Sequence, residues 1–320
     1  MIGQRAVEAI EASDTDDLLR VIDGLSQSRD WEALLELRMR CDEAVGRGKQ
    51  VWGVGEHIRY RLALEAPPEI AGPIVGEGRS RFALGPLPEV AASTKTWAEM
   101  KGHLPVGPER DTFAAERVVR GDVVDANIPD LPSRLAPWEP AYPLATYKRD
   151  KVEAPSPRAP DTLPVEPARS VVVVDDQESA DALSGLVETW TDQSNGRCQV
   201  STVEGDHVAA VTGLGLGSAR MASLEPGEAL SWMCWAAASG GAHGRRRGSA
   251  AGRFNTWWAL SSLVDLEWPP EPQQLGDEVR KLEFFWFDDG SPDTGWVIRL
   301  AISSPRDGIA WAIAAGDHRL

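Results

Sequence analysis

The sequence contains few cysteines and no long apolar run, and both absences narrow the class of protein. Its 320 residues include only three cysteines, Cys41, Cys198 and Cys234. Because they are far apart, odd in number and never in a C-x-x-C pair, they predict neither a disulfide framework nor a zinc knuckle. No stretch approaches the roughly 18 consecutive apolar residues of a membrane span, and the first residues lack a signal peptide's apolar core. We therefore expect a cytoplasmic protein that does not enter a membrane.

Basic residues are also scarce. Lysine and arginine total 33 against 49 aspartates and glutamates, which gives a net charge of -16. Such a field repels nucleic acids and anionic membranes, so we do not expect a nucleic-acid partner. The hydrophobic fraction of 42% and the charged fraction of 26% are those of a folded protein. The length suits two domains.

The common catalytic motifs are missing from the chain. It has no G-x-x-x-x-G-K-[ST] phosphate loop, no G-x-S-x-G elbow and no pair of histidines at metal-ligand spacing. We therefore predict no metal site and no cofactor, with a nucleotide or phosphate ligand as the alternative, and the sequence assigns no catalytic residue. The sequence favours a non-enzymatic protein.

Proline placement divides the chain into three parts. Ten of the 23 prolines lie within 129–169, which predicts an extended linker because each proline removes a backbone donor and restrains its neighbour. Before it, apolar residues such as Leu18 and Ile22 recur at helical spacing in 1–128, which predicts an all-α domain of helix pairs. Asp14 or Thr15 is expected to cap one of these helices, and Ser28 or Asp30 the next. After it, 170–320 mixes strand and helix patterns.

The strand and helix patterns of 170–320 predict an α/β (or α+β) domain with a mixed sheet. The β-branched run 171–174 suits a strand buried on both faces. Two further strands are expected at 198–203 and 207–211, and a half-exposed hairpin at 283–287 and 296–302. Helices are expected at 224–238 and 249–263 and from Ser304 onward.

The most unusual segment is S-G-G-A-H-G-R-R-R-G-S, residues 239–249. Residues 170–320 contain only 11 Lys and Arg, and four of them, including Arg253, lie within nine positions. Glycines permit close approach of a ligand, and the arginines lead into a helix whose N-terminus favours an anion. We predict an anion-binding site here, and a solvated loop whose arginines pair with the domain's own carboxylates is the alternative. The candidate ligands are Arg245, Arg246, Arg247, His243, Gly244, Gly248 and the more distant Arg220.

A second glycine-rich segment follows the strand expected at 207–211. Gly213, Gly215 and Gly217 form a Gly-x-Gly-x-Gly that can make room for a nucleotide when it follows a strand. The nearest following acids, Glu225 and Glu228, belong to a predicted helix and not to a strand end that would hold a ribose. A flexible turn is the competing interpretation.

Together these patterns predict a cytoplasmic interaction or adaptor protein. Its helical domain would bind a protein partner, and the arginine loop would engage an acidic or phosphorylated group. The alternative is a nucleotide- or phosphometabolite-binding enzyme or sensor that uses the glycine turn and the arginines, with Glu204, Asp206 or His207 as its acid–base group. The abundance of arginine and alanine points to a bacterial source.

Overall fold

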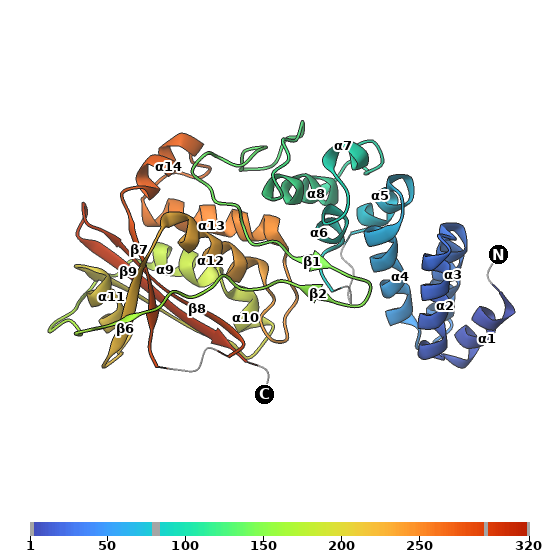
Figure 1. The fold of residues 1–320 in the computed structure, drawn as a ribbon, viewed down its shortest axis with the longest axis horizontal. Coiled ribbons are helices and arrows are strands. Elements are labelled where there is room, and N and C mark those ends of the chain that lie inside the picture. Colours follow the sequence, from blue (N-terminus) through green and yellow to red (C-terminus); the bar gives the residue numbers. More distant parts are fainter. Residues whose placement is uncertain (1–2, 79–83, 291–293, 319–320) are drawn as a thin grey trace. The chain divides into compact units, whose positions relative to one another are not determined.

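The computed structural model describes residues 3–78, 84–290 and 294–318, which fold into two compact units (Figure 1). The first unit comprises the chain up to Arg117 together with 124–127 and 145–153. The second comprises 118–123, 128–144 and the chain from Ala154 onward. The coarse organisation expected from the sequence, helices first and a sheet with helices afterwards, is therefore present.

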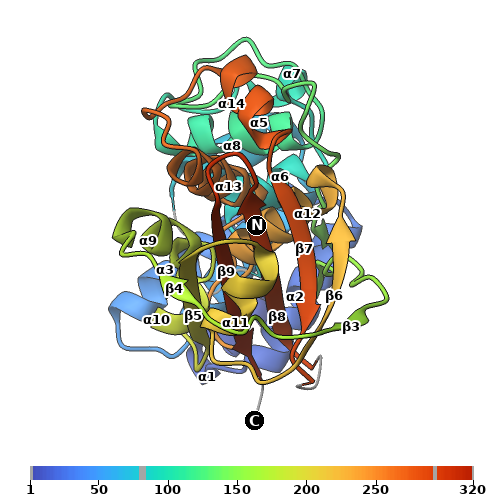
Figure 2. The ribbon, with the colours of Figure 1, turned by 90° about the vertical axis from the view of Figure 1, so that its left-hand side faces the viewer.

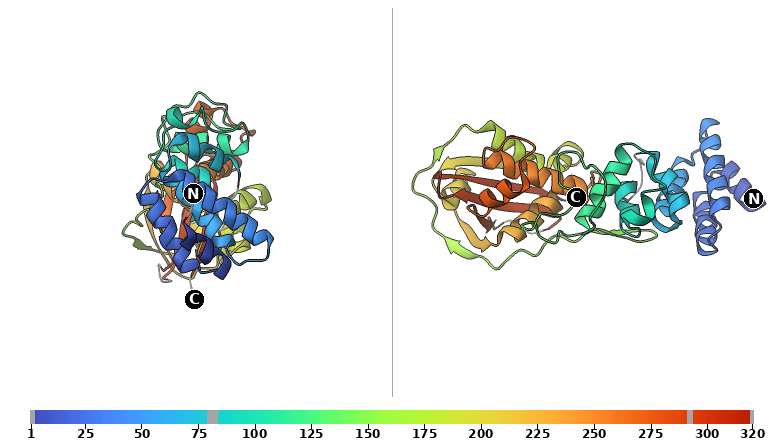
Figure 3. Two further views of the ribbon diagram at one scale, coloured as in Figure 1. Left: turned by 90° about the vertical axis from the view of Figure 1, so that its right-hand side faces the viewer. Right: turned by 90° about the horizontal axis from the view of Figure 1, so that it is seen from above.

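The first unit consists of helices and one short hairpin. Helices α2 and α3 lie side by side, and α4 packs against α3, α5 and α6 (Figures 1 and 3). The helices are α1 (Gln4–Ala12), α2 (Thr15–Gln27), α3 (Trp31–Gly46), α4 (Trp52–Glu65), α5 (Pro68–Gly76), α6 (Leu87–Ala92), α7 (Trp97–Met100) and α8 (Pro108–Val119). The hairpin pairs β1 (Thr146–Tyr147) with β2 (Val152–Glu153).

The beginnings of α2 and α3 follow the capping pattern expected from the sequence. The Asp14 carboxylate accepts a hydrogen bond from Asp17 N, and that of Asp30 accepts one from Ala33 N. Each cap satisfies a backbone donor that has no partner inside its helix. Of the two candidates expected for each cap, the structure therefore uses the aspartate.

The proline-rich segment 129–169 contains no helix among the elements of the structure. Its first part belongs to the second unit, where Trp138 Nε1 donates to Pro272 O over 2.8 Å and Tyr142 is buried. Residues 145–153 form the hairpin of the first unit, in which the Tyr147 hydroxyl lies 2.6 Å from Glu89. The aromatic residues of this segment therefore pack against the units to which they belong.

The second unit is built on a seven-stranded sheet of order β3-β6-β7-β8-β9-β5-β4 (Figure 2). All of its pairings are antiparallel, so the expected mixed sheet is wrong and α+β is the appropriate class. Short connections between β7, β8 and β9 permit only antiparallel pairing. The strands are β3 (Leu163–Val165), β4 (Val172–Val173), β5 (Arg197–Glu204), β6 (Ala219–Leu224), β7 (Glu283–Asp288), β8 (Trp296–Ser304) and β9 (Ile309–Asp317).

Helices cover both faces of this sheet. Helix α11 packs on one face, where Val211 shares a core cluster with Val203, Met221 and Phe287 (Figure 2). On the other face α12 and α13 lie against each other, and Trp232 of α12 stacks on Trp286 of β7 at 4.3 Å. The helices are α9 (Gln177–Gly185), α10 (Glu188–Asp192), α11 (His207–Gly213), α12 (Pro226–Ala238), α13 (Ser249–Leu263) and α14 (Pro272–Val279).

Three strand and helix predictions in this unit are wrong. Residues 207–211 form α11 instead of a strand, because the Asp206 carboxylate accepts from Ala209 N and starts a helix. The run 171–174 forms the short edge strand β4, whose Val172 and Val173 are exposed, instead of a strand buried on both faces. The helix expected from Ser304 is a turn into β9, closed by a 2.6 Å hydrogen bond from Ser304 Oγ to Asp307.

The strand β8 is buried on both faces, although its alternation predicted a half-exposed hairpin. It is the central strand of the seven, and Arg299 is buried in it. The Arg299 guanidinium lies 3.2 Å from Asp289, so its charge is paired inside the unit. A charged residue was therefore mistaken for a sign of solvent exposure.

Candidate functional site

The connection between α12 and α13 contains the arginines singled out in the sequence. We call residues 239–249 the basic loop. Gly241 and Gly248 adopt positive φ angles of 67° and 98°, which side chains rarely tolerate. A Cβ atom on Gly240 would lie 2.4 Å from Gly244 O, and one on Gly244 would lie 2.3 Å from Gly240 O. The glycines thus allow the loop backbone to fold closely upon itself.

The backbone of the basic loop is fixed by hydrogen bonds along its length. Ala242 N donates to the buried Asp317 carboxylate over 2.6 Å, and His243 N donates to Ser194 Oγ over 3.1 Å. Arg247 N donates to Ala238 O over 2.8 Å. At the start of the loop, Trp190 Nε1 donates to Ser239 Oγ over 2.7 Å. The loop therefore presents its side chains from a preorganised backbone.

The three arginines of the loop differ in their surroundings. Arg247 lies 3.1 Å from Glu188, and Arg246 Nη2 donates to Ser249 Oγ over 3.3 Å; both side chains are half-buried. Arg245 is exposed and makes no ion pair with any described residue, and His243 is exposed beside it. Internal pairing thus accounts for Arg247, whereas Arg245 remains available to a ligand.

The start of β5 carries another exposed arginine, Arg197, on the other face of the sheet. It shares that face with Val203, which packs in the α11 cluster, whereas Asp317, which binds the basic loop, faces the opposite way. Arg197 is exposed, pairs through its backbone with Gly316, and forms no ion pair with the described part of the chain. The turn just before it is bonded to the basic loop, since Arg245 N donates to Gln193 Oε1 over 3.4 Å. In the sequence, this turn is marked by Asn195-Gly196, a common turn pattern that lies directly before Arg197.

The N-terminus of α13 lies at the end of the basic loop. Its N-cap is Gly248, which has no side chain to accept from the backbone donors of the first turn. The helix dipole adds partial positive charge there. Arg245 is the exposed arginine of this site.

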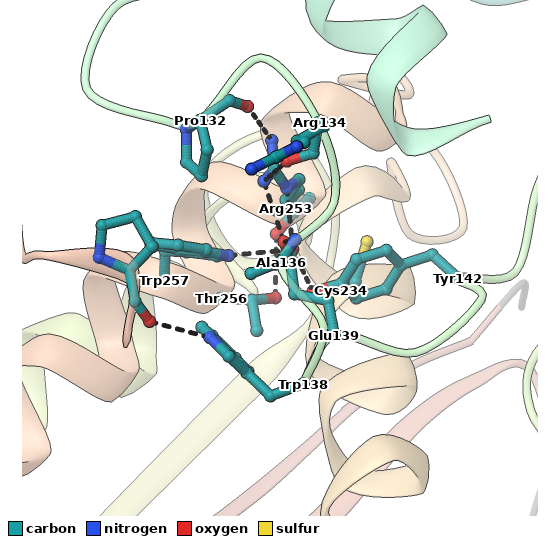
Figure 4. A network of polar contacts seen from close by, with 12 residues as sticks. Pro132, Arg134, Ala136, Trp138, Glu139, Tyr142, Cys234, Arg253, Thr256 and Trp257 are labelled. Carbon is teal, nitrogen blue, oxygen red and sulfur yellow. Dashed lines mark hydrogen bonds and ion pairs between the residues drawn. The ribbon is translucent and has the colours of Figure 1, made fainter. Parts of the chain in front are cut away.

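Arg253, the fourth arginine of the sequence cluster, does not belong to this surface. Its guanidinium is 1% exposed and binds the buried Glu139 carboxylate through two hydrogen bonds of 2.7 and 2.8 Å (Figure 4). It also donates to Pro132 O over 3.1 Å and to Arg134 O over 3.2 Å. Arg253 therefore holds residues 132–139 against α13.

The Glu139 carboxylate at the centre of this network has further donors. Trp257 Nε1 donates to it over 2.9 Å, the Tyr142 hydroxyl over 3.0 Å and Ala136 N over 2.7 Å (Figure 4). Burial, reinforced by the negative charge of Glu139, raises the pKa of the Tyr142 hydroxyl well above its usual value. The network is polar and buried, and its hydrogen-bonding groups are occupied by the protein itself.

Arg220, predicted as a distant member of the anion site, lies elsewhere in the sheet. It is on β6 and donates to Thr162 through its Nε over 3.2 Å. The basic loop is bonded to β9, three strands away in the sheet order, which corresponds to about 14 Å at the usual strand spacing. The structure does not bring Arg220 to the other arginines.

The Gly-x-Gly-x-Gly segment follows a helix and not a strand. Gly213 is the last residue of α11, and a Cβ atom there would lie 2.2 Å from Ser201 Oγ on β5. Gly215 adopts a positive φ of 84°, and Gly217 precedes β6. The strand-then-glycine context on which the nucleotide interpretation depended is therefore wrong, and the first glycine serves close packing of α11 on the sheet.

The three acid–base candidates of the enzyme interpretation differ in what they do in the fold: one caps a helix, one stacks on a ring and one is exposed at a strand end. The Asp206 carboxylate caps α11, as described above. The His207 ring stacks on Phe285 with ring centroids 3.5 Å apart, and burial lowers the pKa of its imidazole. Glu204 is exposed at the end of β5. Within the described ranges, no three His, Cys, Asp or Glu side chains are grouped as metal ligands.

The fold and this site define a class: a helical unit followed by an α+β unit that presents a rigid basic loop. The family of unknown function DUF6183 has a model that matches residues 16–318, and the chain belongs to this family. The comparisons with curated proteins and with solved structures give no match. Among the described residues, no helix combines the length and the apolar character needed to span a membrane.

Proposed function

We propose that the protein is a non-enzymatic adaptor whose basic loop binds an acidic segment of a protein partner. The observation that carries this proposal is the fixed loop backbone, which leaves Arg245 exposed and without an ion pair among the described residues. A preorganised loop loses little conformational entropy on binding. Arginine's planar fork suits carboxylate and phosphate groups.

Surrounding charges support the same choice of ligand. From residue 170 to the end of the chain, acidic residues outnumber basic ones by 21 to 11. Within the loop, the half-buried Arg246 and Arg247 add positive charge beside the exposed Arg245. An acidic segment would meet positive charge here, whereas most of the remaining surface would repel it.

The helical part of the chain is proposed as a second partner-binding surface. Its helices expose several large apolar side chains, which suit contact with a protein more than with a small ion. They are Val7, Leu19, Met39, Val45 and Trp52. The functional division into a helical domain 1–128, a linker 129–169 and a domain 170–320, the cytoplasmic location and the bacterial source are parts of this proposal.

The proposal is tested by binding of a glutamate-rich synthetic peptide to the full chain, measured by calorimetry. The variant replaces Arg245, Arg246 and Arg247 by alanine. The matched control replaces three exposed bases of the same unit, which are Arg280, Lys281 and Arg306. Exposed charge pairs contribute about 0.2–1 kcal/mol each, so the loop variant should bind roughly 3- to 100-fold more weakly.

The control variant should change the affinity less than the loop variant, although both remove three positive charges. Equal losses would mean that only net charge matters and would contradict the proposed site. A nucleotide or phosphorylated metabolite that binds wild type and is converted to a product would replace the adaptor with the enzyme alternative. Alanine at Glu204, Asp206 and His207 should leave peptide binding unchanged.

A further inference from the structure

Three aromatic rings meet on the surface of the second unit, on α13 and in the connection that follows it. Phe254 and Trp258 lie on α13, and Trp268 lies in the connection from α13 to α14. The Trp268 ring centroid is 5.1 Å from that of Phe254 and 5.2 Å from that of Trp258, and both pairs are edge-on. Phe254 and Trp258 each remain 37% exposed. The rings support one another and still face solvent.

This exposure sets Trp258 apart from the neighbouring tryptophans. Trp257, Trp232 and Trp235 are buried in the core formed by α12, α13 and the sheet. Phe254 and Trp258 are four residues apart and therefore share the opposite side of α13. Exposed tryptophans supported by other rings are typical of the residues that dominate protein interfaces.

The sequence from Phe254 to the end of α14 contains only acidic charges. From Phe254 to Val279 there are five acidic residues and no lysine or arginine. Asp277 is paired with Arg280, and Glu278 with Lys281. The other three are exposed and make no ion pair within the described part of the chain; they are Asp265, Glu267 and Glu271. Two of them, Glu267 and Glu271, flank Trp268 in the sequence.

We propose that these rings and carboxylates form a docking surface for an arginine- and lysine-rich segment of a partner protein. We call it the aromatic–acidic patch; its members are Phe254, Trp258, Asp265, Glu267, Trp268 and Glu271. A guanidinium or ammonium group over an exposed ring gains a cation–π interaction, and the three carboxylates attract the same charge. The net charge of -16 steers such a segment toward the protein.

This patch is independent of the basic loop, which selects the opposite charge. Phe254 and Trp258 supply the apolar contact, and the side of α13 opposite to them is already packed against α12. The carboxylates identify the occupant as cationic, because an apolar or acidic segment would leave them unpaired beside it. An adaptor with both surfaces could hold one acidic and one basic partner segment at once.

The test uses the full chain and a synthetic peptide of alternating arginine and serine. Two comparison ligands are used. One is the same peptide with glutamine in place of arginine, and the other is the polyamine spermine. Trp258→Ala should weaken binding of the arginine peptide by about tenfold, because a cation–π contact and an apolar contact are both lost. Circular dichroism confirms that the variant is folded.

A second variant keeps all the rings and removes only charge, as Asp265→Asn, Glu267→Gln and Glu271→Gln. Its matched control neutralises three exposed carboxylates near α9, as Asp175→Asn, Glu178→Gln and Asp181→Asn. Binding should weaken about tenfold in the patch variant and less than twofold in the control. The alanine variant of Arg245, Arg246 and Arg247 should bind the arginine peptide as wild type does, which separates this test from that of the basic loop.

Five results would overturn the proposal, four in binding and one, given last, in the oligomeric state. The four in binding are equal losses in the patch variant and its control, no binding of the arginine peptide to wild type, binding of the glutamine peptide with the same affinity, and binding of spermine as tightly as the peptide. Spermine binding would assign the patch to a small polyamine. Sedimentation of wild type as a dimer that Trp258→Ala dissociates would assign it to a second copy of the chain.

Discussion

Replacement of Glu139 by glutamine should strongly destabilise the second unit. Glutamine has nearly the same shape but no charge, so the guanidinium of Arg253 would stay buried at 1% exposure without a counter-ion. The new amide nitrogen would also face donors, because Arg253 and Ala136 N both donate to the carboxylate. Breaking one partner of a buried ion pair costs about 3–5 kcal/mol. We expect a loss of that size in the free energy of unfolding.

The measurement is urea unfolding followed by tryptophan fluorescence, which reports chiefly the second unit because nine of the 13 tryptophans lie beyond residue 170. Arg253→Met and the double variant complete a mutant cycle. The double variant should lose about 1–3 kcal/mol less than the sum of the single losses, since it leaves no unpaired charge. A loss below about 1 kcal/mol for Glu139→Gln would refute the reasoning, because the pair would then not be desolvated.

Three further predictions concern local features. Burial lowers the pKa of Lys95 from 10.5 to about 8. The free energy of unfolding of wild type relative to Lys95→Met should therefore increase as pH rises from 8 to 10.5, by about 1.4 kcal/mol per pH unit. Urea unfolding across that range checks the sign. Gly252→Ala would place Cβ 2.4 Å from Cys234 O and should lower the free energy of unfolding by about 1–3 kcal/mol. Gly24→Ala, where a Cβ meets open space, should raise it by about 0.5–1 kcal/mol, and thermal unfolding measures both variants. Asp30→Ala should lose about 0.5–2 kcal/mol and Asp30→Asn much less, in the same measurement.

Much of the helical part could be predicted from the sequence because its signals are local. The stripe of Leu18 and Ile22 and the caps at Asp14 and Asp30 depend on residues within one or two turns. The structure has the same helices at those places. Local signals also predicted the positions of α12 and α13, since proline and glycine residues bound their long apolar runs.

The sheet was harder to predict from the sequence, because the order and the burial of its strands depend on residues that are far apart in the chain. Arg299 suggested an exposed face, yet β7 and β9 enclose it and Asp289 neutralises it. The four valines 171–174 suggested a central strand, yet β4 pairs with only the last two residues of β5. Ser304 and Asp307 fit a helix cap and a tight turn equally well, and strand pairing after the turn decided between them.

The arginine cluster shows why spacing alone could not define the candidate site. Arg245 and Arg253 are eight residues apart and belong to the same sequence cluster, but one is exposed on a loop and the other is buried in α13. The partner that buries Arg253 is Glu139, which lies 114 residues earlier in the proline-rich segment. Conversely, Arg197 is only four residues from Gln193, which bonds to Arg245 N, yet the alternation of β5 puts its side chain on the other face of the sheet. The charge available to a ligand is therefore fixed by which carboxylates the fold brings to each arginine, and that selection leaves Arg245 exposed without an ion pair to a described residue.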